Sequence, residues 1–170
     1  MNAIMFLALR ASHVLVAAVW IGSSIFVATQ VMPVIEASGA SGGQVLMRLN
    51  HRMHLYMGLL GGTTVVTGLY LLWRFAGGFA AVGSTHAGVA FGVGGSAGIL
   101  AGIIGGGVVG RSAAKAGALM RQAAATVDGP AKGELMQHLA QLRRRIQLGS
   151  KVTITLQLIA LVLMSVGHYV

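Results

Sequence analysis

The chain has 170 residues, of which 55% are hydrophobic and only 9% are charged, and its mean hydropathy is +0.79. A soluble domain carries about 25% charged residues, so this composition indicates a membrane protein. The absence of cysteine excludes disulfides, thiolate metal sites, iron–sulfur clusters and catalysis by a thiol.

Four apolar segments approach or exceed the ~20 residues that a helix needs to cross a bilayer. The first, residues 4–33, is interrupted by Pro33 and a run of small residues. Its apolar run is too long for a signal peptide, so we expect a retained membrane helix. We predict a single all-α, polytopic domain, a bundle of four transmembrane helices whose other three members are residues 53–75, 85–110 and 152–169.

The segment between the third and fourth spans, residues 111–151, predicts a cytoplasmic helical hairpin. Ser112–Thr126 is rich in alanine and should continue the third span as a helix. Asp128-Gly129-Pro130 is a turn signal. Residues 131–150 then carry apolar side chains at three- and four-residue spacing, which favours a helix that packs on its partner: Leu135, Leu139, Leu142 and Ile146.

The basic residues predict the orientation in the membrane. The net charge is +9, but ten of the twelve lysines and arginines lie in residues 111–151 or between the first two spans. The positive-inside rule places both regions in the cytoplasm and both termini outside, as in a multi-pass protein of the bacterial cytoplasmic membrane. The triple Arg143–Arg145 is expected at the level of anionic lipid headgroups. The distribution gives no reason to expect nucleic acid as a partner.

Each predicted span contains one histidine, and ionisable side chains are rare at membrane depth. Imidazole is the commonest metal ligand and titrates near neutrality. The topology places His13, His86 and His168 toward the outer side, where they could form a copper site or include two axial ligands of a haem iron. The alternative is two interfacial histidines and one satisfied core histidine. His54 lies toward the cytoplasm, as a second site or an interfacial residue.

Glycines in the third span recur every four residues, and such stripes let helix backbones approach closely in lipid. They predict packing within the bundle or across a homo-oligomer, or a flat groove that admits a macrocycle. The stripe consists of Gly94, Gly98, Gly102, Gly106 and Gly110.

Three further sets of residues share helix faces. His54 lies on one face with Gly58, Gly61, Val65 and Gly68, a glycine track along which a porphyrin could lie. His13 shares a face with Ala17, Trp20 and Ser24, and His168 shares one with Gln157, so polar groups should face inward.

Other catalytic schemes lack their residues. The three acidic residues, Glu36, Asp128 and Glu134, all lie in predicted cytoplasmic regions, so no carboxylate pair is available inside the membrane for acid–base chemistry. No Ser-His-Asp set can be assembled in the bundle, and no nucleotide-binding motif occurs. We predict no catalytic residue, and any enzymatic activity would be that of a haem-dependent membrane oxidoreductase.

The segment from His13 through Trp20 to Gly22 resembles the H-x6-W-x-G pattern in the first helix of copper-resistance protein D-like membrane proteins. It is also similar to the first helix of the bacterial membrane-embedded protoporphyrinogen oxidases, whose histidine is associated with haem. Arg52–Leu72 resembles the second helix of this group, and Leu163–Tyr169 is similar to the closing helix of relatives. The resemblance implies a four-helix bundle with His13 as a ligand. The spans lack the lysine of those oxidases, and the outer loops lack the methionines and histidines of a copper importer.

The first functional hypothesis is therefore a membrane protein that binds haem b, with His13 as one axial ligand and His86 or His168 as the other. It would serve in electron transfer, haem handling or redox sensing, with a redox partner in the membrane. The second is copper binding or transport through the outer histidines. The third is a cofactor-free accessory subunit that docks through its glycine stripe.

Overall fold

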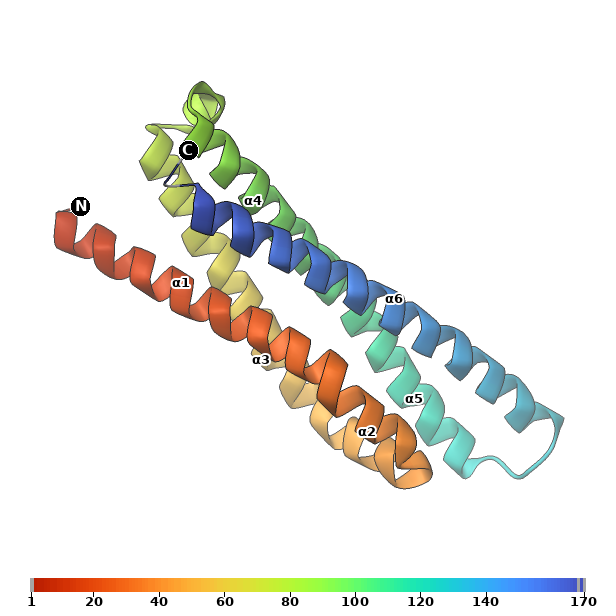
Figure 1. Cartoon of the computed structure of the whole chain (residues 1–170). Coiled ribbons are helices and arrows are strands. Elements are labelled where there is room, and N and C mark those ends of the chain that lie inside the picture. Colours follow the sequence, from red (N-terminus) through yellow and green to blue (C-terminus); the bar gives the residue numbers. More distant parts are fainter. Residues whose placement is uncertain (1, 168, 170) are drawn as a thin grey trace.

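The computed structural model describes residues 2–167 and 169, and the side chains within them except those of residues 36, 39–43, 46–47 and 50–51. These residues form long helices that run up and down an elongated bundle, with no strand among them (Figure 1). In chain order the elements are α1 (Ala3–Phe26), a π-helical segment (Val27–Val31), α2 (Met32–Ala37), α3 (Gly39–Ala76), a 3₁₀ turn (Phe79–Ser84), α4 (His86–Ile103), a second π-helical segment (Ile104–Gly110), α5 (Arg111–Ala125) and α6 (Pro130–Val166).

Four stretches of the described helices are long and apolar enough to cross a membrane. This confirms the predicted all-α class and the four membrane helices, and it indicates a multi-pass membrane protein. The four stretches are Ala3–Ile35, Arg52–Ala76, His86–Ala125 and Pro130–Val166.

The first two predicted spans agree with the membrane-compatible stretches within two residues, but the helices that contain them extend further. Pro33 does not end the first helix, because the chain passes through the π-helical turn Val27–Val31 directly into α2. A widened turn ahead of a proline accommodates a residue that has no N–H to donate. The second long helix begins at Gly39 and not near residue 53, although its membrane-compatible part does start at Arg52.

The last helix also differs from the prediction of two separate elements. Residues 131–150 and the fourth span form one continuous helix, α6, which ends at Val166. Gly149 causes no break, because it is buried where α6 packs against the second π-helical segment, and a Cβ there would lie 2.8 Å from a methyl carbon of Val109. Close helix contact therefore accounts for this glycine.

Local sequence explains where the helices begin and end. The Asn2 side chain accepts a hydrogen bond from the Met5 amide at 2.9 Å and caps α1, and Thr85 caps α4 through the Gly88 amide at 3.0 Å. Gly77, with φ of 73°, ends α3 in the left-handed region. Gly78 has φ of 135°, which also favours glycine, and lets the chain turn toward α4.

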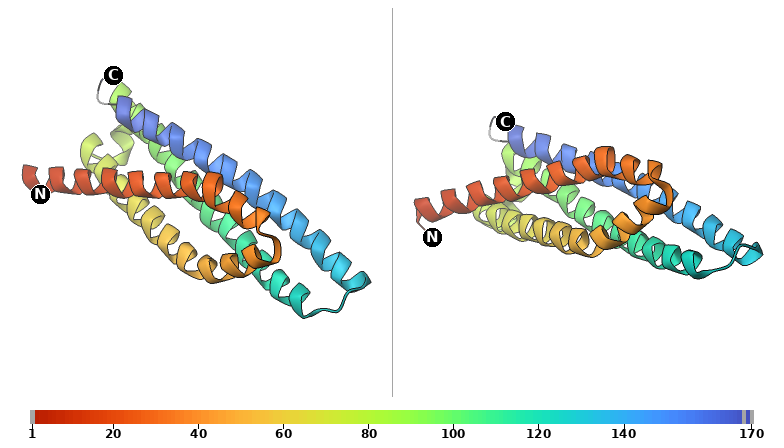
Figure 2. Two further views of the ribbon diagram at one scale, coloured as in Figure 1. Left: turned by 60° about the horizontal axis from the view of Figure 1, so that its bottom comes forward. Right: turned by 90° about the horizontal axis from the view of Figure 1, so that it is seen from below.

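Helix α1 packs mainly on α3, and α4 packs mainly on α6, so the bundle consists of two pairs. Helix α1 begins and α6 ends at one end of the bundle, and the turn between α5 and α6 lies at the other (Figures 1 and 2). Helix α5 lies against the first half of α6, where Leu139 is buried. Small buried residues of α5 permit this contact: Ser112, Ala116, Gly117 and Ala123.

Candidate functional site

A cavity of about 870 Å³ lies between the two helix pairs, with walls from α1, α3, α4 and α6 and from the 3₁₀ turn that precedes α4. Most of its lining is apolar. Exposed lining residues such as Val14 and Leu161 show that the cavity opens to the outside of the bundle, where acyl chains would lie. The polar side chains of its wall include Arg10, His13, Thr64, Ser96, Gln157 and Ser165.

Two glycines of α3 bring α1 close enough to place His13 and Trp20 in the wall of the cavity. A Cβ on Gly68 would lie 2.8 Å from Cε1 of His13, and a Cβ on Gly61 would lie 3.0 Å from the Trp20 ring. His13 and Trp20 are seven residues apart on α1, and Gly61 and Gly68 are seven residues apart on α3, so the antiparallel packing of these helices places each ring against one glycine. His13 is 7% exposed and Trp20 is 6% exposed.

A hydrogen bond joins the His13 ring to α3 and is compatible with the tautomer that carries its proton on Nδ1. Nδ1 of His13 lies 2.9 Å from Oγ1 of Thr67. The single hydroxyl proton of Thr67 donates to the Thr63 carbonyl at 2.6 Å, with the Thr64 carbonyl at 3.2 Å. When the Thr67 hydroxyl donates to the Thr63 carbonyl, its oxygen accepts from Nδ1–H of the neutral imidazole and Nε2 keeps its lone pair; in the other tautomer Thr67 donates to Nδ1. Metal-binding histidines normally have the first arrangement, in which the second nitrogen donates to a fixed acceptor.

Gln157 on α6 is the second polar group of interest in the wall. It is 1% exposed, and its Nε2 donates to Oγ of Ser24 at 3.1 Å. Its amide oxygen has no hydrogen-bond partner among the described residues. A buried acceptor left unpaired costs about 1–3 kcal/mol. The predicted inward face of the fourth span is confirmed for Gln157, and that of the first span for His13 and Trp20.

Thr153 lies one turn before Gln157 on α6 and is also buried, at 7% exposed. Its methyl group packs over Gly105, where a Cβ would lie 3.4 Å from Cγ2 of Thr153. Its hydroxyl oxygen lacks a partner among the described residues. Thr153 does not line the cavity, whereas Gln157 does, so the Thr153 hydroxyl is not part of the candidate site.

Of the predicted outer histidines that the structure describes, His13 and His86 do not line a common cavity. His86 is exposed at the start of α4, and His13 is the one histidine that the described part of the cavity wall contains. His168 lies outside the described residues. Among the described residues, no group of three histidines or carboxylates is placed to hold a metal ion. A copper site formed with His168 therefore stays a prediction.

His54 lies far from the cavity. It precedes Gly68 by fourteen residues on α3, which corresponds to roughly 21 Å along the helix. Its side chain is exposed, and its ring covers Gly110, where a Cβ would lie 2.9 Å from Cε1 of His54. The surroundings of His54 thus differ from those of His13.

The glycine stripe of the third span is used for several purposes within the chain. Gly94 packs on α6, where a Cβ would lie 3.3 Å from side-chain atoms of Leu163 and Met164, and Gly110 accommodates His54. Gly98 lines the cavity, and Gly106 is exposed with no atom within 4 Å of a Cβ. Only part of the stripe thus mediates close packing inside this chain.

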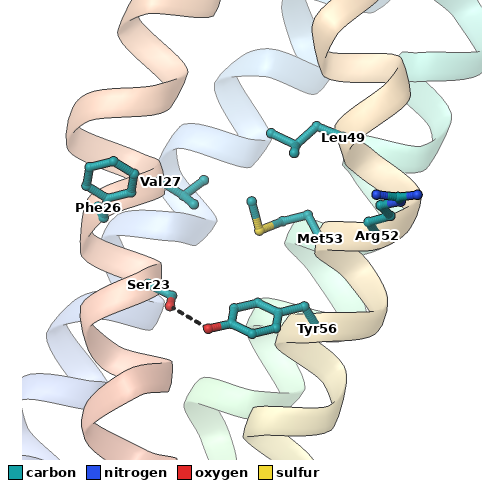
Figure 3. A pocket seen from close by; sticks show the side chains of 7 residues that line it. All are labelled: Ser23, Phe26, Val27, Leu49, Arg52, Met53 and Tyr56. Carbon is teal, nitrogen blue, oxygen red and sulfur yellow. Dashed lines mark hydrogen bonds between the residues drawn. The ribbon is translucent and has the colours of Figure 1, made fainter.

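A smaller hollow of about 420 Å³ lies between the end of α1 and the first half of α3 (Figure 3). In Figure 3, Ser23 and Tyr56 point toward each other across the gap, with their hydroxyl oxygens 3.4 Å apart, and Met53 lies beside them. Arg52 is its one charged lining residue, and its described wall contains no histidine. The described lining residues of this hollow therefore supply no imidazole for haem or copper.

Sequence reasoning did not identify three residues of the site. Thr67 bonds to His13, and Arg10 and Met164 line the cavity, but none of the three was predicted as a site residue; Thr67 and Met164 fell only within the segments that resemble the family. The shared spacing of seven residues between His13 and Trp20 and between Gly61 and Gly68 could have revealed the contact of the first two spans.

Comparison with known proteins gives no match: no protein family, no curated protein and no solved structure is similar enough to this chain to be assigned to it.

Proposed function

We propose that this chain is a membrane-embedded b-type haem protein that binds haem in the central cavity, with Nε2 of His13 as one axial ligand. The observation that carries the proposal is the bond between Nδ1 of His13 and Thr67, because it engages Nδ1 and, in the tautomer in which Nδ1–H donates, leaves Nε2 for a metal. His13 lines the cavity at the point where α1 and α3 meet over Gly68.

The cavity suits a large, flat, apolar ligand. Its volume of about 870 Å³ falls in the range of about 300–1,000 Å³ that is usual for cofactor pockets. Its walls include the aromatic rings of Trp20, Phe75 and Phe91 together with glycine backbone from α3 and α4. Arg10, three residues before His13, also lines it, and a guanidinium is the side chain best suited to a carboxylate such as a haem propionate.

The protein's own contribution to the chemistry would be orientation and exclusion of water. Bound haem supplies one-electron redox chemistry, and its axial ligands and surroundings set the potential. Thr67 holds the imidazole plane, and the apolar walls keep the site dry. These features suit electron transfer, haem handling or redox sensing, with a redox partner in the same membrane.

The arrangement of the helices supports the proposed orientation. The arginines and lysines of α5 and of the first half of α6 are mostly exposed and lie at the end of the bundle that holds the turn. We propose that this end faces the bacterial cytoplasm, that the helical hairpin of residues 111–151 extends there, and that both termini lie outside. The His13 end of the cavity is then on the outer side.

Haem titration of the purified protein tests the proposal. We expect the wild type to bind about one haem per chain and the His13→Ala variant to lose most of this binding. A His54→Ala variant serves as the control, since His54 lies outside the cavity, and it should bind haem as the wild type does. Equal haem binding by the His13→Ala variant and the wild type would refute the role of His13.

The other hypotheses have distinct outcomes in the same preparation. Copper that survives washing, and that His13→Ala removes, would support the copper alternative and count against haem. A wild type that holds neither metal would favour an accessory subunit. Exposed Gly106 would then be a candidate contact with a second copy, and Gly106→Leu should change the oligomeric state in detergent.

A further inference from the structure

We propose that the smaller hollow, between α1 and α3, binds an anionic phospholipid, with one acyl chain between the two helices and the charged headgroup on Arg52. This inference goes beyond haem binding, because none of the residues that line the hollow lines the central cavity. Three observations support it: an open apolar gap, the depth of that gap in the membrane, and an exposed arginine at its rim.

The walls of the hollow suit an acyl chain. Its lining residues recur at three- and four-residue spacing on both α1 and α3, so each helix presents one face to the gap. In Figure 3, Val27 of α1 points toward Leu49 and Met53 of α3, and the hydroxyl groups of Ser23 and Tyr56 meet at the end nearer the central cavity. The volume of about 420 Å³ lies in the usual range of about 300–1,000 Å³ for ligand pockets. Apart from the two hydroxyl groups and Arg52, the lining side chains are apolar.

The hollow lies at the expected depth for the edge of the hydrocarbon layer. Tyr56 precedes Ala76, the last residue of α3, by twenty residues, which corresponds to roughly 30 Å along the helix and equals the thickness of that layer. Tyrosine and tryptophan are enriched at both membrane–water interfaces, and Tyr56 and Trp73 are each 44% exposed near opposite ends of this span. Arg52 lies one turn beyond Tyr56, which places it at the level of the lipid headgroups.

Arg52 supplies the charge that selects the headgroup. Its side chain is exposed and has no ion-pair partner among the described side chains. In Figure 3 its guanidinium lies outside the gap, where a headgroup would lie when the acyl chain enters. A guanidinium can donate two parallel hydrogen bonds to a phosphate. Arg48, one turn earlier on the same face of α3, is also exposed and adds positive charge beside the rim. The two arginines favour a lipid with net negative charge over a zwitterionic one.

Photocrosslinking in vesicles tests the proposal without any variant. The protein is reconstituted in phosphatidylcholine vesicles that contain a small fraction of one probe, either phosphatidylglycerol or phosphatidylcholine, each with the same diazirine-bearing acyl chain. Mass spectrometry measures labelling of Phe26 and Val27 in the hollow, and Val66, which is 67% exposed and does not line the hollow, reports general contact with lipid.

After normalisation to Val66, we expect the phosphatidylglycerol probe to label the hollow about 5-fold more than the phosphatidylcholine probe, which is the preference that one arginine at an anionic headgroup provides. Equal labelling of the hollow by the two probes would overturn the proposal. Labelling of Val66 by both probes with none in the hollow would also overturn it.

Two pairs of variants locate the effect. Arg52→Gln should lose most of the preference for phosphatidylglycerol, whereas Arg74→Gln is the matched control, because Arg74 is exposed at the other end of α3 and does not line the hollow. Met53→Trp should fill the hollow and block its labelling, whereas Leu55→Trp, at an exposed position outside the hollow, should not. A preference that persists in Arg52→Gln, or that Arg74→Gln removes equally, would refute the assignment to Arg52. Unchanged labelling in Met53→Trp would refute the hollow as the site of the acyl chain.

Discussion

Substitution of Gly68 by alanine tests the geometry around His13 most sharply. A Cβ at residue 68 would lie 2.8 Å from Cε1 of His13 and 3.6 Å from both ring nitrogens. Carbon atoms in favourable contact are about 3.5–4.0 Å apart, so the imidazole must move by about 0.7 Å or more, or α1 must move away from α3. The strain of such overpacking is typically about 1–3 kcal/mol. A movement of this size would lengthen the 2.9 Å bond to Thr67 beyond hydrogen-bond distance.

The assay is haem content per chain from the absorption spectrum, together with thermal unfolding in detergent. We expect Gly68→Ala to lose much of its haem and to unfold at a lower temperature. Gly62→Ala is the matched control on the same helix, because a Cβ there meets no atom within 4 Å, and it should match or exceed the stability of the wild type. A Gly68→Ala protein with the haem content and spectrum of the wild type would refute the contact between His13 and α3.

Three further predictions concern single groups. Thr67→Val should weaken haem binding about 10- to 100-fold, as expected when the partner of a ligating histidine is lost, whereas Thr67→Ser should retain it; titration of both variants decides. His86→Ala should leave the haem spectrum unchanged because His86 is exposed and outside the described cavity wall. Lys132 donates a hydrogen bond to Asp128 and adds a nearby positive charge, and both effects lower the pKa of the Asp128 carboxyl. The ion pair therefore stabilises the folded turn above the ordinary carboxyl pKa, and this stabilisation is lost as the pH falls through the lowered pKa. NMR titration should find the lowered pKa in the wild type and an ordinary carboxyl pKa in Lys132→Gln.

Much of the fold could be predicted from the sequence, because crossing a bilayer requires long apolar helices whose backbone bonds are all internal. Hydropathy alone locates such segments, and all four were found. The first span ends close to the predicted residue 33, but hydropathy and helix-breaking residues do not reveal the π-helical segment Val27–Val31 through which the chain continues past Pro33 to Ala37. The continuity of residues 131–150 with the fourth span was not predicted, and Gly149 within α6 reflects close packing against the second π-helical segment.

The candidate site was predicted only in part. His13 could be found because a histidine within an apolar helix is unusual, and Gln157 because it lies on an inward face. The hydrogen bond between His13 and Thr67 could not be found in the same way, because it depends on the register of α1 against α3. Threonine is ordinary in membrane helices, so nothing in its own sequence neighbourhood distinguishes Thr67 as the partner of a ligand.

The visible absorption spectrum of the protein purified from haem-replete cells tests the central claim most directly. The account predicts a Soret band in the wild type that sharpens with α and β bands on reduction, and that is lost or strongly diminished in His13→Ala. A folded but colourless wild type, or a His13→Ala variant with an unchanged Soret band, would contradict it.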